Sequence, residues 1–321
     1  MKRLILGCAA LIFAAAAVPA AAQDRIRVAI GQRGNWDTVV TQMAIDQGIM
    51  RRHNLEAAIT WTSGGPEQIQ AVVTGSADFG VAAGTIGAIS AIARGAPIKM
   101  IAAQMTGSPD LFWYVRADSP IRSMRDTAGQ AVSFSRPGAS THLVIQLLAA
   151  AAGVRPNLVS TGDIAGTRTQ VMSGQIAVGW SSPPLGLDLI RSGQLRIIAR
   201  GSDLPQIADQ TVRVIVASNA VLTQRRDVAR RYVQAYAEAI EWMYANQDAS
   251  LAAYARFNEI SLDIARETLQ FFPRAAMRVT PIANIPLSIE QGVEYRLLDR
   301  PVTAQQVESS MIDYVYRPPG Q

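Results

Sequence analysis

Extended apolar segments alternate with helical patterns between Arg25 and Ala103, and this alternation is the feature that most constrains the fold. Arg25 to Ile30 alternates polar and apolar residues as a strand does, whereas Trp36 to Ile49 repeats its apolar residues at helical spacing. The same order recurs as far as the extended segment Ile98 to Ala103. A strand–helix–strand order joins parallel strands through helices that cover the sheet, so the sequence predicts an α/β fold with a mostly parallel sheet.

The pattern then starts again. Leu111 to Val115 and Ala131 to Phe134 read as strands and Thr141 to Ala152 as a helix. Residues 70–80 (QAVVTGSADFG) also resemble residues 170–179 (QVMSGQIAVG), each indicating a helix, a glycine turn and a short strand. We therefore expect two α/β units of one kind. Because ligands of open α/β sheets bind beyond the carboxyl ends of the strands, two facing units would line a cleft with such loops.

The N-terminus has the three parts of a secretory signal peptide. Lys2 and Arg3 form a charged start, Leu4 to Val18 is apolar, and Ala20 to Ala22 forms an A-x-A cleavage site. The apolar run is too short and too rich in alanine to predict a membrane span. A lipoprotein processing box at Ile5 to Cys8 is the alternative, and it would leave only a very short apolar stretch. We predict that residues 1–22 are a cleaved signal peptide and that the mature chain is periplasmic.

Composition excludes several classes of protein. The one cysteine, Cys8, lies in the predicted signal peptide, so the mature chain has no disulfide, thiolate metal site or cysteine nucleophile. The sequence has no H-E-x-x-H, no G-x-S-x-G and no phosphate loop, and we expect no metal, no cofactor and no catalytic residue. The net charge of +5 falls to +3 without Lys2 and Arg3. This mild excess of positive charge suits a small anionic ligand and is too weak to argue for nucleic acid. We also expect the protein to be a monomer.

Residues 135–141 (SRPGAST) lie between a predicted strand and a predicted helix. Gly138 allows a sharp turn, and Ser140 or Thr141 can cap the helix. A helix N-terminus presents free N–H groups and a partial positive charge, to which Arg136 adds a full charge and a forked donor. Taken alone, the segment is an ordinary capped helix or half of an anion-binding site. The surrounding chain favours the second interpretation.

Several further segments together resemble a known family. They are Gly75 to Gly80, Gly95 to Ile98, Val115 to Ile121, Asp126 to Val132 and Trp180 to Pro183. These segments are similar to the periplasmic substrate-binding proteins of ABC importers of the nitrate/sulfonate/taurine type, which resemble NMT1/THI5-like proteins. The resemblance covers essentially the whole mature chain. The chain departs from the family at Ala177, where an aspartate is usual, and at Pro183-Pro184.

The resemblance implies a two-lobed periplasmic-binding-protein clamshell of type II-like form, each lobe a mostly parallel sheet flanked by helices. Lobe one would comprise residues 23–108 plus 212–321, and lobe two residues 109–211. Such a protein is not an enzyme. It captures a small organic ligand between its lobes, here an anionic one of sulfonate or taurine type, and delivers it to an ABC permease in the inner membrane.

Family analogy also suggests which loops contact the ligand. The residues implied are Arg33, Asn35, Trp36, Ser63, Gly64, Gly65, Gly84, Thr85, Ser135, Arg136, Gly138, Ser140, Thr141, Trp180 and Ser181. We expect Arg136 and the helix start beside it to hold the anionic group. Trp36 and Trp180 would cover an apolar or planar ligand body from opposite lobes.

Three alternatives stay open. The same clamshell serves ligand-sensing partners of membrane signalling proteins, and the ligand could instead be a pyrimidine or an aromatic carboxylate. The related thiamin-pyrimidine synthases are enzymes of similar fold. They carry a cysteine-rich segment and an active-site histidine constellation, neither of which is visible in this sequence.

Overall fold

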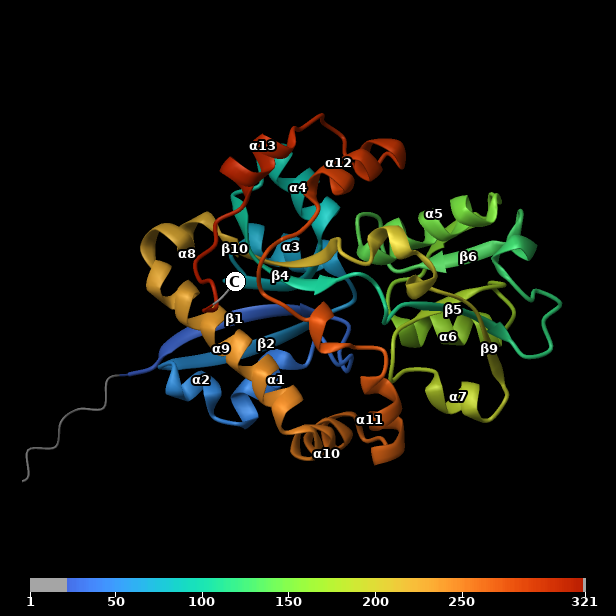
Figure 1. Cartoon of the computed structure of the whole chain (residues 1–321), viewed down its shortest axis with the longest axis horizontal. Helices are drawn as coiled ribbons and strands as arrows, with labels where there is room; N and C mark the ends of the chain where they lie inside the picture. Colours follow the sequence, from blue (N-terminus) through green and yellow to red (C-terminus); the bar gives the residue numbers. More distant parts are fainter. Residues whose placement is uncertain (1–21, 320–321) are drawn as a thin grey trace, which may run out of the picture.

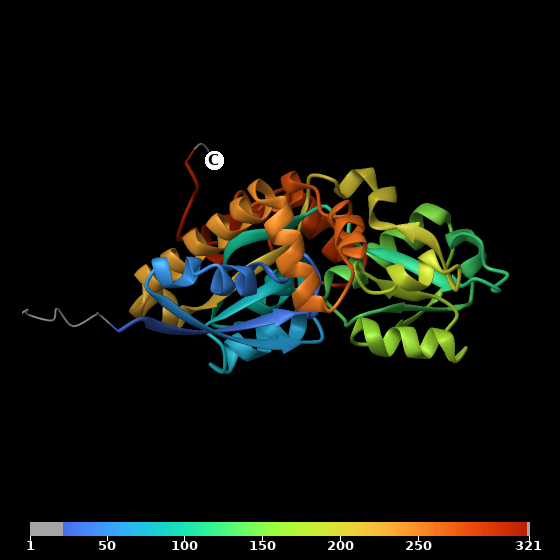
Figure 2. The ribbon, with the colours of Figure 1, turned by 90° about the horizontal axis from the view of Figure 1, so that it is seen from below.

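Two groups of strands, each with its own helices, lie side by side along the long axis of the molecule (Figures 1 and 2). The fold was obtained as a computed structural model that describes residues 22–319. Residues 1–21 of the predicted signal peptide, with Cys8, lie outside the described residues. We call the group that contains the N-terminal strand lobe one and the other group lobe two.

Lobe one is built on a five-stranded sheet of order β2-β1-β3-β10-β4. Its strands are β1 (Asp24–Gly31), β2 (Leu55–Thr62), β3 (Phe79–Gly84), β4 (Ile98–Thr106) and β10 (Thr211–Ser218). Strand β1 is parallel to β2 and β3, whereas β10 is antiparallel to both β3 and β4. Four strands therefore run one way and β10 runs against them.

Lobe two contains a three-stranded sheet of order β8-β5-β9 and a two-stranded sheet of β6 and β7. Its strands are β5 (Phe112–Arg116), β6 (Ala131–Phe134), β7 (Asn157–Ser160), β8 (Gly179–Ser181) and β9 (Leu195–Arg200). A parallel bridge between Val132 and Val178 joins the two sheets into the order β7-β6-β8-β5-β9. Only β5 runs against the other strands.

The two lobes thus share one strand order, in which the fourth strand is the reversed one. In each lobe that strand enters directly from the other lobe: β5 follows β4, and β10 follows β9. The predicted α/β architecture of two similar units is confirmed. The predicted mostly parallel sheets are mixed, because each crossing strand arrives without an α-helix that would turn it to run with its neighbours. The crossings lie between Thr106 and Phe112 and between Arg200 and Thr211, and the predicted lobe limits stay a prediction.

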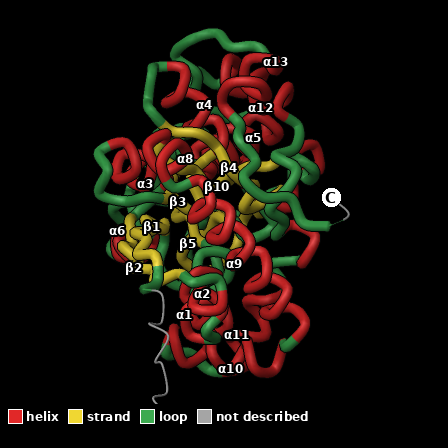
Figure 3. Tube along the Cα trace, turned by 90° about the vertical axis from the view of Figure 1, so that its left-hand side faces the viewer, coloured by secondary structure: helices red, strands yellow, loops and turns green. Residues whose placement is uncertain are grey.

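Helices cover both faces of the lobe-one sheet (Figure 3). The helices are α1 (Val40–Asp46), α2 (Ile49–Arg52), α3 (Gly65–Val73), α4 (Thr85–Ala93), α5 (Ser140–Ala152), α6 (Ile164–Met172), α7 (Leu187–Arg191), α8 (Asn219–Gln224), α9 (Arg226–Ala245), α10 (Gln247–Asn258), α11 (Leu262–Leu269), α12 (Ile285–Glu294) and α13 (Ala304–Gln306). Helices α1, α9 and α10 pack on one face, and α3, α4 and α12 pack on the other. Within residues 22–319, no helix is long and apolar enough to cross a membrane.

Short helical turns complete the secondary structure. Turns of 3-10 type lie at Met124–Thr127, Gly201–Asp203, Pro205–Ile207 and Arg274–Ala276, and Val307–Met311 forms a π-helical turn. Two of these turns, Gly201–Asp203 and Pro205–Ile207, lie in the crossing between β9 and β10. The segment that joins the lobes there is therefore itself partly ordered.

The core of lobe one contains a stacked aromatic pair that offers a test of its packing. Phe79 of β3 is fully buried, and its ring centroid lies 4.4 Å from that of Tyr232 of α9. We expect Phe79→Ala to lower the free energy of unfolding by about 3–5 kcal/mol, because it removes buried apolar area and leaves a cavity. Urea denaturation measures the change. Leu262→Ala is the control, since Leu262 is 43% exposed, and it should change stability by about 0.5 kcal/mol or less. Equal losses in both variants would contradict the described core.

Candidate functional site

A small cavity of about 40 Å³ lies between the lobes, at the carboxyl ends of β1, β6 and β8. Lobe one contributes the loop that follows β1, together with Gly65, Ala82 and Arg213. Lobe two contributes Ser135, the start of α5 and Trp180. The ends of several sheet strands therefore meet at one place, which is where ligands of open α/β sheets bind.

The cavity is small in this conformation. A cavity needs about 10–15 Å³ to hold a water molecule, so the space holds only a few waters. An organic ligand can enter only when the lobes move apart, and it would then hold them further apart than they are here. The structure thus represents a closed arrangement without a ligand-sized space.

Buried Arg213 of β10 forms the charged wall of the cavity. Its Nη1 lies 3.0 Å from Asp37 Oδ2 and its Nη2 lies 2.8 Å from Asp110 Oδ2. Its Nε donates to Ser140 Oγ of α5 at 3.0 Å. The side chains of the three charged residues are no more than 7% exposed. One guanidinium thus connects the loop after β1, the crossing segment between β4 and β5, and helix α5 of lobe two.

Two carboxylates share this one guanidinium. Asp37 Oδ2 also accepts a hydrogen bond of 3.0 Å from Gln104 Nε2, while Asp37 Oδ1 has no partner among the residues that the structure describes. Burial raises the pKa of Asp37, the Arg213 charge opposes that rise, and the Asp110 charge adds to it. With both carboxylates ionised, the cluster carries one uncompensated negative charge.

Two residues that line the same cavity have a strained backbone conformation. Gln32 and Ala82 both line it, and both have a positive φ, of 50° and 66°, which residues with a Cβ rarely adopt. Ala82 lies where the register between β3 and β10 shifts, opposite Val214 and Ile215. Such conformations cost about 1–3 kcal/mol each and cluster at ligand clamps, so their presence here supports a binding role for the cavity.

Arg136, which we expected to hold the anionic group of the ligand, does not line this cavity. Its Nη2 lies 2.7 Å from Glu67 Oε1 and donates to Ser63 Oγ at 2.7 Å, both in lobe one. Its charge is therefore paired across the lobes. Because the two charged side chains are about 40% exposed, the ion pair adds about 1 kcal/mol at most to closure. Arg136 thus connects the two lobes by an ion pair and a hydrogen bond.

Six of the predicted residues line the cavity, and three others border a second small space at the seam between the lobes, which Ser140 also lines. The lining residues are Asn35, Gly65, Ser135, Ser140, Thr141 and Trp180. The seam residues are Gly84, Thr85 and Gly138. Both sets come from the strand ends and helix starts that the sequence indicated. Their role as ligand contacts stays a prediction.

The remaining predicted residues have other surroundings. Trp36 is fully buried in the lobe-one core, with its ring centroid 4.9 Å from that of Tyr254. Arg33 is exposed, and its guanidinium lies 4.7 Å from the ring centroid of Phe257. Ser181 Oγ donates to the Leu185 carbonyl. Ser63 accepts a hydrogen bond from Arg136, and neighbouring Gly64 lies beside the Arg136 side chain. Of the two predicted tryptophans, only Trp180 lines the cavity.

Sequence reasoning missed the charged residues that the cavity does contain. Asp37 directly follows the predicted tryptophan, and Asp110 lies in the predicted crossing segment. Arg213 had a readable signal, because it is the one charged residue in the apolar run Thr211–Ser218. An isolated charge in a strand that is otherwise buried requires a buried partner, and that requirement indicates a site.

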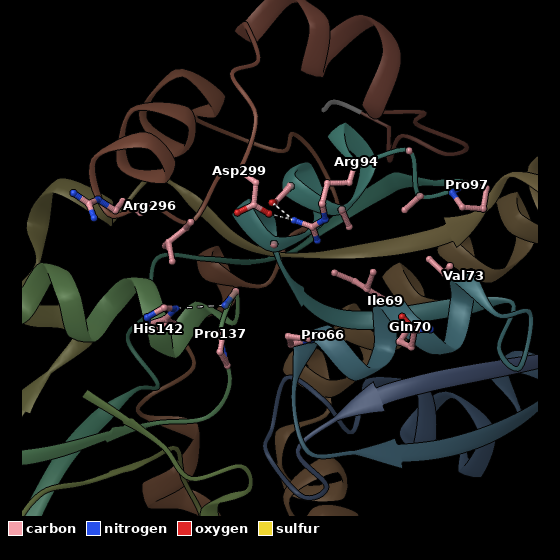
Figure 4. A pocket seen from close by; sticks show the side chains of 17 residues that line it. Pro66, Ile69, Gln70, Val73, Arg94, Pro97, Pro137, His142, Arg296 and Asp299 are labelled. Carbon is pink, nitrogen blue, oxygen red and sulfur yellow. Dashed lines mark hydrogen bonds and ion pairs between the residues drawn. The ribbon is translucent and has the colours of Figure 1, made fainter. Parts of the chain in front are cut away.

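A larger cavity of about 650 Å³ opens beside the seam, between α3, α4 and the start of α5 (Figure 4). Its charges are largely paired: Arg94 forms an ion pair with Asp299. His142 Nδ1 lies 3.4 Å from Gly138 N, and burial lowers the pKa of the His142 ring. Most of its lining lies away from the carboxyl ends of the strands, so we take the smaller cavity as the candidate site.

Comparison with known proteins supports the fold. The family model described as NMT1/THI5 like matches residues 35–250. A protein of Brucella abortus (strain 2308) named as a binding protein is 27% identical over 242 residues, which are 74% of this chain and 73% of that protein.

Solved structures match over nearly the whole chain. The alkanesulfonate-binding protein SsuA of Xanthomonas axonopodis pv. citri, bound to MOPS, superimposes with a TM-score of 0.77 at 19% identity, over 92% of this chain and 100% of that one. The desulfurization enzyme DSZB superimposes with a TM-score of 0.63 at 15% identity, over 89% and 96%. The predicted fold class, the two-lobed fold of periplasmic binding proteins, is confirmed.

Close backbone contact at the seam predicts that a single methyl group prevents this closed arrangement. A Cβ atom at Gly87 of α4 would lie 2.5 Å from the carbonyl oxygen of Gly138 in lobe two. We expect Gly87→Ala to raise the radius of gyration of the ligand-free protein in solution scattering. Its melting temperature should hold or rise, since alanine favours a helix over glycine by about 1 kcal/mol. Gly166→Ala in α6, where the Cβ meets atoms no closer than 3.5 Å, is the control. An unchanged radius would contradict the closed seam.

The buried cluster predicts a pH-dependent loss of stability in Arg213→Gln. Removing the guanidinium leaves two buried carboxylates unpaired, which lowers the free energy of unfolding by about 3–5 kcal/mol at neutral pH. The pKa of Asp37 then rises further in the folded state only, and a raised folded pKa contributes stability at low pH that is lost as the pH increases. The loss should therefore shrink as the pH falls toward 3.8, the ordinary value for the Asp37 carboxyl.

Urea denaturation at neutral and acidic pH measures this change. Arg230→Gln, which breaks an exposed pair with Asp227, is the control and should cost about 1 kcal/mol or less. A loss for Arg213→Gln that does not depend on pH would contradict this account of the cluster.

Proposed function

The chain belongs to the NMT1/THI5-like family, and on that premise we propose that it is a periplasmic solute-binding protein for a small anionic organic ligand of sulfonate or taurine type. It would capture the ligand between its lobes and deliver it to an ABC permease in the inner membrane. The name of the Xanthomonas structural neighbour, an alkanesulfonate-binding protein, supports the ligand class. Nitrate, a pyrimidine or an aromatic carboxylate are the alternatives that the test below includes.

One observation carries the proposal: the start of a long helix and several hydrogen-bond donors converge on a cavity shared by both lobes. Helix α5 runs for 13 residues from Ser140, and Ser140 and Thr141 of its first turn line the cavity. Trp180 also lines it, and its Nε1 has no partner among residues 22–319. The first N–H groups of a helix lack partners within the helix and attract anions. The lobe-two wall therefore suits the oxygen atoms of an anionic group.

Capture requires no chemical step. In the open form a ligand binds one lobe, and the lobes then close about the two crossing segments, as in other hinge-closing proteins. Contacts made only in the closed form, such as the Arg136–Glu67 ion pair and the Arg213–Ser140 hydrogen bond, shift the population toward that form. A micromolar dissociation constant needs about −8 kcal/mol, which a few charge-assisted hydrogen bonds and burial of the ligand body supply together.

An enzyme of the same fold is the main competing class, because DSZB shares the fold and is a desulfurization enzyme. A catalytic role would need a nucleophile or an acid–base pair in the cavity. The cavity wall offers a carboxylate and hydroxyl groups, Asp37 and Ser140 among them, and the carboxylate is paired with Arg213. Release of a chemically altered ligand during prolonged incubation would favour the enzyme over the binding protein.

A ligand screen tests the proposal. We expect at least one sulfonate or other small organic anion to bind with a dissociation constant near micromolar in calorimetry and to change the fluorescence of Trp180. Trp180→Phe should remove the fluorescence change, whereas Trp113→Phe should preserve it, because buried Trp113 does not line the cavity and its Nε1 donates to the Ser133 carbonyl. Binding of a pyrimidine or of nitrate alone, or no binding to folded protein, would contradict the proposed ligand class.

A further inference from the structure

The charges around the small cavity do not balance. Asp37 is 1% exposed and Asp110 is 0% exposed, and both carboxylates pair with Arg213. The other side chains that bond to them are neutral: Gln104 donates to Asp37, and Ser182 donates to Asp110. With both carboxylates ionised, an anionic ligand in the cavity would meet net negative charge in a buried place, which is costly.

The two carboxylates differ in how their oxygen atoms are bonded. Both oxygens of Asp110 accept from Arg213 Nη2, at 3.2 and 2.8 Å. Asp37 Oδ2 accepts from Arg213 and Gln104, whereas Asp37 Oδ1 has no hydrogen-bond partner within residues 22–319. A proton on Asp37 Oδ1 therefore leaves every bond of the cluster in place. It also turns an acceptor without a partner into a donor at the cavity, which Asp37 lines.

The titratable groups that face Asp37 come from four parts of the chain. They are Arg213 of β10, Asp110 of the crossing between β4 and β5, Tyr236 and Tyr244 of α9, and Tyr254 of α10. Burial raises the pKa of the three tyrosines, so they stay neutral near neutral pH. Arginine stays protonated in the same range. A change of protonation in this cluster therefore falls on a carboxyl, and the free Oδ1 assigns it to Asp37.

The lobe-two wall presents donors to the same space, namely the start of α5 and the unpartnered Nε1 of Trp180. We propose that Asp37 is protonated when the ligand is bound, that its Oδ1–H donates to the ligand oxyanion, and that capture of one anion takes up one proton from solvent. This inference rests on the proposed function, since it assigns a lobe-one donor to the same anionic ligand. The proton balances the second carboxylate, which Arg213 alone does not.

Proton uptake gives the affinity a pH dependence of fixed sign. Burial and the Asp110 charge raise the pKa of Asp37 in the free protein, against the Arg213 charge, and a bound anion beside the carboxyl raises it further. Binding is therefore tightest at low pH. Between the free and bound pKa values, each rise of one pH unit weakens binding up to about tenfold. A sulfonate stays ionised throughout this range, so the dependence belongs to the protein.

Calorimetry with sulfonates that carry no amine tests the inference. The probes are methanesulfonate, ethanesulfonate and benzenesulfonate. For a probe that binds, we expect the dissociation constant to rise about tenfold or more between about pH 5.5 and about pH 7.5. Binding heats in buffers of different ionisation enthalpy count the protons, and we expect more than about half a proton per ligand.

Variants assign the proton to one group. Asp37→Asn keeps the shape and donates at every pH, so it should bind without proton uptake and more tightly than the wild-type protein at about pH 7.5. Asp118→Asn, which changes an exposed carboxylate paired with Arg116, is the matched control and should leave the proton count unchanged. His142→Gln removes the histidine of the larger cavity and should leave it unchanged as well.

The outcomes separate this inference from the proposed function. If a sulfonate binds with the same affinity at both pH values and without proton uptake, or if only 2-aminoethanesulfonate binds, the inference is wrong and the proposed function stands. Proton uptake that persists in folded Asp37→Asn protein would equally overturn it. If Asp37→Asn does not fold, the proton counts of the wild-type protein and His142→Gln decide. If no small anion binds at either pH, the proposed function fails, and the inference fails with it.

Discussion

The structure depends most on one buried guanidinium. Arg213 lies in β10, the strand that returns to lobe one, and it pairs with Asp110 of the first crossing segment and with Asp37 of the loop after β1. Its third contact, Ser140, belongs to lobe two. A buried charge is tolerated only when it is paired, so the arginine fixes the positions of both carboxylates. The same pairing holds the crossing segment, the cavity wall and the start of α5 in one arrangement.

The shared strand order of the lobes explains why so many chain segments meet at this point. In each lobe the reversed fourth strand comes from the other lobe, so the two crossings lie beside each other at the junction of the sheets. The carboxyl ends of β1, β6 and β8 then face one another across the cavity. Gln32 and Ala82 have a left-handed backbone conformation at this cavity. Such a conformation persists only where the surrounding contacts hold it in place.

The lobes meet through apolar as well as polar contacts, since Ile86 of α4 belongs to the same core cluster as Leu143 and Leu147 of α5. The Arg136–Glu67 ion pair is partly exposed and contributes little. The backbone of Gly138 approaches α4 closely because Gly84 and Gly87 have no Cβ atoms. A ligand that contacts both lobes can then shift the population by its own binding energy.

The amino-acid sequence by itself determined the α/β class, the two similar units and the helix predicted from Thr141, because these follow from the local periodicity of apolar residues and from turn chemistry. It also indicated Trp180 and Ser135, which line the cavity. Only the tertiary structure decided the charges at the site. Arg136 and Trp36 match the family pattern, yet one is paired with Glu67 and the other lies in the core. Asp37, Asp110 and Arg213 meet across sequence separations of up to 176 residues. Which charges neutralise one another in a buried site is set by strand order and chain crossings, and no local pattern encodes those pairings.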